Sequence, residues 1–373
     1  MSEYIFKKED IEEFLDGLTI FGTGGGGEPE WGRVILKNEF ENNRKMRIVD
    51  PEDVEDDAFV CSGGIMGSVK SLEGISYEQV TASWEEFFPL VEAIKVMEKL
   101  RGRKVDYLVP FEIGALNTPV IMAAATRLGI PMVNADGNGR SAPETQMISF
   151  IGHGIKLYPM PLVDKNNNVT VVMESKSTTF ADEVGRFLVV KSGGMGANAH
   201  YPMSGSELKK FAIPHTVLAA LSVGKSIREA RESNKDPVPV FIEMVSGSEL
   251  FRGTITQLEG LDRGGFYLTD VTLTGVNRSQ KTNAKLVIKN ETMALWIDEK
   301  IRAIFPDLIF MLDPVSGKGI PTIELEIGKE VVLIGAPVHD RIRQFLHTEI
   351  GKQSFGGNRY GYPDLEYLPI ETL

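Results

Sequence analysis

The sequence predicts two domains: an N-terminal three-layer α/β domain with a mainly parallel sheet (residues 1–165) and a β-rich C-terminal α+β domain (residues 166–373). The chain has 373 residues, more than one hydrophobic core usually organises. Strand, turn and helix follow one another three times before Phe150, which is typical of a parallel sheet covered by helices. After Pro237, short β-type runs alternate with turns, which predicts an antiparallel sandwich or barrel-like unit.

Composition narrows the class of protein. Hydrophobic content of 42% and charged content of 25% are ordinary for a globular chain, and the net charge of −12 argues against a nucleic-acid or anionic-membrane partner. The single cysteine, Cys61, excludes an internal disulfide and a cysteine-based zinc site. The N-terminus lacks an apolar signal core, and no run approaches the ~20 apolar residues that span a bilayer. We expect a cytoplasmic homo-oligomer that acts on a small molecule.

The first element is a helix within Lys8–Ile20, and a second helix is predicted for Trp31–Asn42. Between them, residues Gly22 to Pro29 hold five glycines among eight residues. Glycine lets backbone N–H groups approach a phosphate or carboxylate closely. The loop follows a helix and lacks the lysine and hydroxyl residue of a P-loop, so we expect no nucleotide cofactor. A tight connector is the alternative, but a run of glycines lowers local stability, which favours a functional loop.

The α/β pattern continues from residue 47 to residue 129. Strands are predicted at Arg47–Val49 and Ala58–Cys61, and SGGIMGS (Ser62–Ser68) is interpreted as a glycine-bearing turn. A helical pattern over Tyr77–Leu100 is broken at Pro89. A strand is predicted at Tyr107–Pro110, followed by a turn with the sequence FEIGALN (Phe111–Asn117). A helix then covers Thr118–Gly129 and ends at Gly129.

The segment VNADGNGRSAPETQM, Val133 to Met147, predicts another strand, turn and helix. Ser141 is the expected N-cap, with Glu144 completing a capping box. Carboxyl ends of neighbouring parallel strands meet at one edge of a sheet, so we expect Asp136 to converge with Glu112. Paired carboxylates there could hold a divalent cation or act as acid and base. The alternative is a capped turn in which Arg140 neutralises its acidic neighbours.

From Gly152 the pattern changes to a hairpin with its turn at Lys165–Asn168, near which we place the domain boundary. A helix over Phe180–Val190 is followed by KSGGMGANAHYPMSG, interpreted as a glycine-rich loop. Its residue His200 could titrate near neutral pH, act as acid or base, or bind a metal, and the alternative is a loop histidine bonded to backbone. A capping box at Ser204 and Glu207 precedes a helix over His215–Glu232. The predicted strands that follow are Val238–Met244, Ser248–Gly260, Gly264–Gly275, Ala284–Asn290, Thr292–Asp298, Ile301–Leu312 and Glu330–Pro337.

Several motifs occur together in an order that resembles one known family. They are FGTGGGGEP, SGGIMGS, FEIGALN, DGNGRSAPETQM and KSGGMGANAHYPMSG, with IKNETM, FPDLIFMLD and VVLIGAP in the second half. This set resembles the S-methyl thiohydantoin desulfurase family, which is also labelled hydantoinase-like. The resemblance implies an α/β domain followed by a β-rich domain. It also implies hydrolytic loss of methanethiol from an S-methylated thiohydantoin, or action on related cyclic imides or ureas. The family turn does not require Cys61, so we expect no cysteine nucleophile.

The hypothesis is therefore a hydrolase acting on a five-membered hydantoin-like ring in a site between the domains. Glu112 or Asp136 is the expected base and His200 the expected acid. Alternatively, a divalent metal with Glu112, Asp136 or His200 as candidate ligands replaces the base by activating water. Asn117 and the glycine backbone are expected to bind ring oxygens or a substrate carboxylate. The full predicted substrate-binding set is Thr23, Gly24, Gly25, Gly26, Gly27, Gly64, Met66, Asn117, Asn138, Arg140, Glu144 and Asn198. The alternative function is a noncatalytic binding or regulatory subunit of a hydantoinase.

Overall fold

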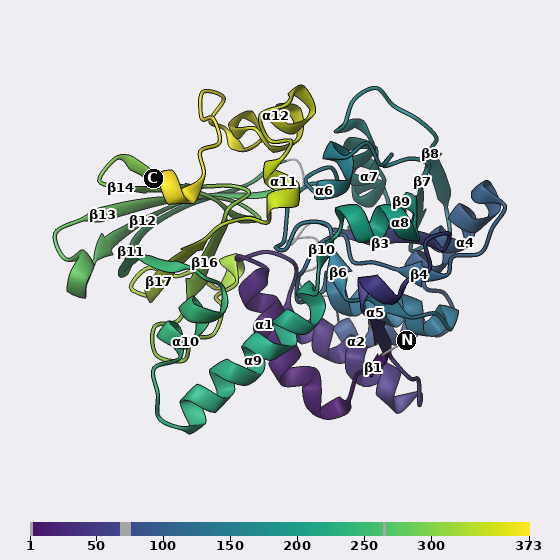
Figure 1. Ribbon diagram of the computed structural model, residues 1–373, viewed down its shortest axis with the longest axis horizontal. Coiled ribbons are helices and arrows are strands. Elements are labelled where there is room, and N and C mark those ends of the chain that lie inside the picture. The colour runs from purple at the N-terminus through teal and green to yellow at the C-terminus, as the bar shows by residue number, and fades with distance from the viewer. Residues whose placement is uncertain (1–2, 68–75, 264–265) are drawn as a thin grey trace.

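The computed structural model describes residues 3–67, 76–263 and 266–373 and shows two sheet-based units side by side. In the view of Figure 1, α1 and α9 run below the left-hand sheet. The helices are α1 (Ile11–Phe21), α2 (Pro29–Glu41), α3 (Tyr77–Ser83), α4 (Pro89–Arg101), α5 (Asn117–Leu128), α6 (Ser149–Gly152), α7 (Phe180–Lys191), α8 (Gly205–Phe211), α9 (Thr216–Glu232), α10 (Pro237–Met244), α11 (Asp340–Arg343) and α12 (Glu349–Phe355). None of the helices in these described ranges combines the length and apolar character needed to cross a membrane.

The first unit is built on an eight-stranded mixed sheet in the order β1-β2-β5-β4-β3-β9-β7-β8. Its centre, β2-β5-β4-β3, is parallel, and the flanking strands pair antiparallel. The strands are β1 (Glu3–Ile5), β2 (Arg47–Val49), β3 (Phe59–Gly67), β4 (Tyr107–Leu108), β5 (Met132–Val133), β7 (Met160–Asp164), β8 (Val169–Val172) and β9 (Met195–Ser204). Because β9 follows residue 165, this sheet takes strands from both sides of the predicted domain boundary.

Helices cover both faces of this sheet. Side chains alternate along each strand, so Ile48 belongs to the apolar cluster that includes residues of α1, α2, α4 and α5. Val49 belongs to the cluster on the other face, which includes residues of α6, α7 and α8. This arrangement confirms the predicted three-layer α/β domain.

The second unit is an antiparallel seven-stranded sheet in the order β15-β14-β13-β12-β11-β17-β16. Its strands are β11 (Ser248–Arg263), β12 (Phe266–Gly275), β13 (Asn283–Lys289), β14 (Glu291–Ile297), β15 (Lys300–Ile304), β16 (Leu308–Leu312) and β17 (Glu330–Ala336). A short pair, β6 (Ala135–Asp136) with β10 (Ile213–Pro214), lies outside both sheets. The predicted β-rich second domain is confirmed.

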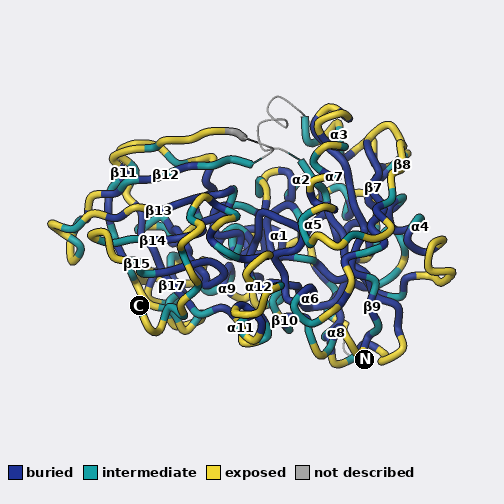
Figure 2. The backbone as a smooth tube through the Cα atoms, turned by 90° about the horizontal axis from the view of Figure 1, so that it is seen from above, coloured by how far each residue is buried: buried dark blue, intermediate teal, exposed yellow. Residues whose placement is uncertain are grey.

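One apolar cluster joins the two units. Ile20 of α1 and Ile227 of α9 pack with Phe310 and Val332 of the antiparallel sheet, so the buried interior continues from one unit into the other (Figure 2). The chain segments that flank this cluster therefore have fixed positions relative to one another.

Two glycine-rich segments interpreted as loops are strands. The predicted turn after Cys61 continues β3 to Gly67, and β9 begins at Met195 and pairs antiparallel with β3. The glycines mislead because they mark close approach: a Cβ on Gly63 would lie 2.5 Å from the Asn198 carbonyl oxygen of β9. Ser68, Gly264 and Gly265, which ended or began predicted segments, lie outside the described residues.

Two other predictions gave the wrong type of secondary structure. No helix follows Ser141, because its hydroxyl donates to Glu291 and the Glu144 carboxylate pairs with Lys289, so neither side chain caps a helix. The segment beginning at Pro237 is a helix rather than a strand, because the Asp236 carboxylate accepts from the Val238 N–H and proline occupies the first turn.

Candidate active site

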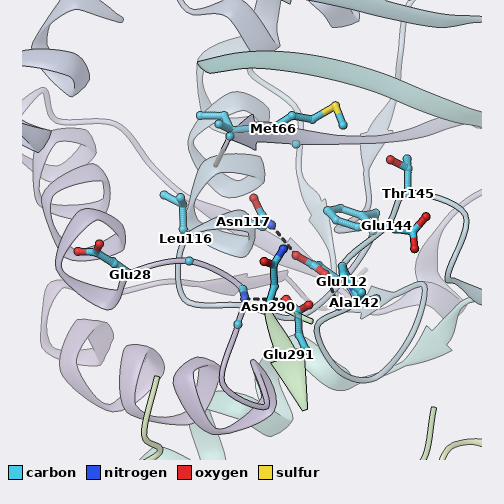
Figure 3. A pocket seen from close by; sticks show the side chains of 18 of the residues that line it. Glu28, Met66, Glu112, Leu116, Asn117, Ala142, Glu144, Thr145, Asn290 and Glu291 are labelled. Carbon is cyan, nitrogen blue, oxygen red and sulfur yellow. Dashed lines mark hydrogen bonds between the residues drawn. The ribbon is translucent and has the colours of Figure 1, made fainter. Parts of the chain in front are cut away.

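A cavity of about 150 Å³ lies between the two units (Figure 3). The first unit contributes the glycine loop, the end of β3, the segments after β4 and around Ala142, part of α7, and Asn198 with His200 from β9. The second unit contributes Asn290, Glu291 and the segment from Pro321 to Ile323. The cavity therefore lies where the sequence predicted the site, between the domains.

Glu112 forms one wall, in the loop between β4 and α5. Its side chain is buried, the Asn117 amide nitrogen donates to Oε1, and the Ala142 N–H donates to Oε2 at 2.6 Å (Figure 3). Burial raises the pKa of Glu112 to about 7, although these hydrogen bonds favour the ionised form. The carboxyl group can therefore exchange a proton near neutral pH.

Glu291, the first residue of β14, is the second buried carboxyl group of the cavity. Its Oε1 accepts from the Gly26 N–H and the Ser141 hydroxyl, each at 3.2 Å, whereas Oε2 has no hydrogen-bond partner among the described residues. Burial, and then the neighbouring charge of Glu112, raise its pKa to about 8. Ionisation of Glu112 therefore disfavours ionisation of Glu291. Sequence reasoning missed Glu291, although it lies in the family motif IKNETM.

The glycine loop holds this pair in place. The Gly26 carbonyl accepts from the Leu116 N–H at 2.9 Å, and the Gly24 carbonyl accepts from the Thr322 N–H at 2.8 Å. A Cβ on Gly25 would lie 2.0 Å from Oε1 of Glu291. The loop thus lines the cavity, contacts both domains and allows Glu291 to approach the backbone closely.

His200 lies in the middle of β9 and is fully buried. Neither ring nitrogen has a hydrogen-bond partner in the described part of the chain, and the ring meets Phe111 edge-on at 5.6 Å between centroids. Burial lowers the pKa of His200 to about 3, so the ring is neutral near pH 7. A neutral ring offers one N–H donor and one acceptor nitrogen, and the role of His200 as the general acid stays a prediction.

Asp136, the alternative base, does not line the cavity. The turns do converge, since the Gly137 N–H donates to the Phe111 carbonyl at 3.0 Å. The Asp136 carboxylate, however, bends back to accept from the N–H groups of Asn138 and Gly139. Its geometry is that of a turn-stabilising side chain, because short polar side chains readily satisfy nearby backbone donors.

Three other predicted binding residues, Thr23, Asn138 and Arg140, also lie outside the cavity lining. Arg140 is fully buried, and its guanidinium donates to Thr23 Oγ1 and to the carbonyls of Thr292 and Asp307 at 2.7–2.8 Å. It therefore ties the first unit to the second behind the cavity. The remaining predicted residues all line it: Gly24, Gly25, Gly26, Gly27, Gly64, Met66, Glu112, Asn117, Glu144, Asn198 and His200.

The far end of the cavity is held by ion pairs that sequence reasoning did not find. Glu144 pairs with Lys289 and Arg359, and Asp182 of α7 accepts from Arg186 at 2.7 Å. Lys289 and Arg359 are far from Glu144 in the sequence, so no local pattern predicts these pairs, whereas Asp182 and Arg186 lie one turn apart on α7. The three metal-ligand candidates Glu112, Asp136 and His200 do not gather: the described residues contain no group of three or more His, Cys, Asp or Glu side chains that could hold a metal ion.

Known families match the chain in both halves. A family described as the S-Me-THD-like N-terminal domain matches residues 9–174, and the S-Me-THD-like C-terminal domain matches residues 176–370. The chain belongs to the S-Me-THD-like family. Membership confirms the resemblance to the S-methyl thiohydantoin desulfurase family found in the motifs.

Among solved structures, the S-Me-THD-like fold is shared with a crystal structure of a protein from Chromobacterium violaceum. The two are 22% identical with a TM-score of 0.79, over 98% of this chain and 100% of the other. At this identity the likeness shows the fold alone. Comparison with curated proteins gives no match.

Both S-Me-THD-like regions supply residues to the cavity. Glu112 lies in the region matched by the N-terminal family domain, and His200 and Glu291 lie in the region matched by the C-terminal one. His200 nevertheless belongs to a strand of the eight-stranded sheet.

Proposed function

We propose that this protein hydrolyses the carbon–sulfur bond of an S-methylated thiohydantoin, releasing methanethiol and leaving a hydantoin. The observation that carries this proposal is the pair of carboxyl groups of Glu112 and Glu291, which are buried in one cavity that both domains line. Cavities of about 150 Å³ hold a ring of the size of benzene, so the volume suits a five-membered ring with a small substituent.

The surroundings of the pair support a division of roles. Asn117 and Ala142 donate to Glu112, which favours its ionised form and makes it the base. Both hydrogen bonds to Glu291 reach Oε1, whereas Oε2 has no partner in the described structure, so Glu291 retains the proton and is the acid. Paired carboxyl groups in different environments divide acid and base work in this way.

In the reaction that we propose, the oxygen of a water molecule bonds to the ring carbon that carries sulfur, and Glu112 takes a proton from that water. The electron pair of the carbon–nitrogen double bond moves to the ring nitrogen, where the N–H of neutral His200 stabilises the developing charge. Glu291 then protonates sulfur as the carbon–sulfur bond breaks and the carbon–nitrogen double bond re-forms. Finally, the new hydroxyl returns its proton to Glu291, and Glu112 protonates the ring nitrogen. The hydantoin leaves with both carboxyl groups restored.

The test is an assay of methanethiol release from S-methylated thiohydantoins. Glu112→Gln removes the base and should lower turnover by about 10²-fold or more. Glu98→Gln is the matched control, because Glu98 is a buried carboxylate bonded to Lys104 and the Val105 N–H, outside the cavity. It should keep wild-type turnover. Binding of the ring by the wild type without release of methanethiol would contradict the proposal and support the noncatalytic subunit.

A further inference from the structure

The cavity suits a leaving group more basic than a thiol. We propose that the same site also hydrolyses cyclic guanidines, hydantoin-type rings with an amino group in place of the methylthio group, and releases ammonia. This inference rests on the proposed function, because it uses the same attack of water at the same ring carbon. It adds a second class of substrate.

The first argument is the acid. A thiol resembling cysteine ionises at a pKa of about 8.5, so a thiolate can leave with little help from an acid. An amino group leaves only after it has gained a proton. Glu291 presents a buried carboxyl oxygen, Oε2, that no described residue engages, beside the base Glu112. A proton donor built into the wall in this way matches what an amine leaving group requires.

The second argument is hydrogen bonding. Asn117 gives its amide N–H to Glu112, while its Oδ1 is buried without a partner among the described residues. A buried acceptor left unpaired is unfavourable, so a substrate that supplies a donor there is favoured. An amino substituent brings two N–H donors, whereas a methylthio group brings none. The unpaired amide oxygen therefore selects for the amino group.

The chemical step balances without any added reactant. Water bonds through oxygen to the ring carbon, and its proton passes to Glu112. Glu291 transfers its proton to the exocyclic nitrogen, the bond between that nitrogen and the carbon breaks, and ammonia leaves. The product hydroxyl reprotonates Glu291, and Glu112 protonates the ring nitrogen. One water is consumed and one ammonia released, with no change in oxidation state.

The experiment compares two rings that differ only in the substituent, methylthio or amino. Methanethiol is measured with a thiol reagent and ammonia with a coupled dehydrogenase assay. We expect the wild type to release both products. Glu291→Gln should lower ammonia release by about 10²-fold or more but methanethiol release by about 10-fold or less, because only the amine depends fully on the acid. Glu98→Gln should leave both rates unchanged.

The possible failures are distinguishable. Methanethiol release without ammonia release overturns this inference and leaves the proposed function standing. An equal loss of both activities in Glu291→Gln overturns the argument from the acid. Release of neither product by the wild type overturns the inference together with the proposed function.

Discussion

Glu291 and Glu112 illustrate, at the scale of single residues, how a site can oppose the stability of the fold that holds it. Burial raises the pKa of Glu291 from its ordinary 4.5 to about 8. Between these values the folded protein keeps a proton that the unfolded chain has released, so stability falls as pH rises. The destabilisation is absent below pH 4.5 and complete above about pH 8. Glu291→Gln removes it and should therefore stabilise the protein at pH 8.5 by up to about 5 kcal/mol, with little change at pH 4.5. Chemical denaturation at the two pH values measures this difference. A gain of equal size at both, or the same gain in Glu98→Gln, would contradict it.

The same residue scale shows which site residues a sequence can reveal. Glu112 could be found because it follows a predicted strand of a parallel sheet, where side chains gather. Asp136 met the same criterion, yet its carboxylate accepts hydrogen bonds from the backbone N–H groups of its own turn. Glu291 begins an antiparallel strand that lies 179 residues after Glu112 in the sequence. Only tertiary packing brings it to the cavity, so no local pattern could assign its role.

At the scale of elements, the glycines of the loop serve two different purposes: Gly25 leaves room for a site residue, and Gly26 adopts a backbone conformation that favours glycine. Gly25 does not have positive φ, and an added Cβ would meet the Glu291 carboxylate; Gly26 has φ +76°, and its Cβ would lie 2.7 Å from the Gly114 backbone. Gly25→Ala should therefore displace the acid and lower turnover by about 10-fold or more while the protein stays folded. Gly26→Ala should instead impair folding.

Measurements of turnover and of thermal melting distinguish the two variants. The control is Gly196→Ala, where the nearest atom to a Cβ is at 3.4 Å. Unchanged turnover in folded Gly25→Ala would refute the role of this glycine.

Elements were predictable where the local signal and the tertiary context agree. The break at Pro89 and the capping box at Ser204 are recovered as predicted, because proline and cap chemistry act within a few residues. The β3 and β9 predictions failed because glycine indicates either a turn or close strand contact, and the partner strand decides which. Pro237 to Met244 failed because its β-branched residues outweighed the Asp236 cap in the sequence pattern.

At the scale of the whole molecule, the periodicity of the sequence predicted the two domains, but it did not predict the contacts that hold them together. Arg140 is the central link: it donates to Thr23 of the glycine loop, to Thr292 of β14 and to Asp307, and its guanidinium lies 4.9 Å from the Phe305 ring. Sequence reasoning placed this arginine at the substrate. Its burial instead makes it part of the frame that holds Glu112 and Glu291 side by side in the cavity wall.

Replacing this arginine tests the frame. Arg140→Met should lower the free energy of unfolding by about 3 kcal/mol, because buried carbonyls lose charge-assisted donors. It should also reduce turnover, because the two carboxyl groups come from different domains. Arg140→Lys should recover little, since one ammonium cannot reproduce the planar set of donors. Arg33→Met, which removes surface ion pairs to Glu12 and Glu30, should change stability by less than about 1 kcal/mol. Denaturation and turnover of the three variants check this. Wild-type stability in Arg140→Met would show that the apolar cluster around Ile20 and Phe310 suffices to hold the domains together.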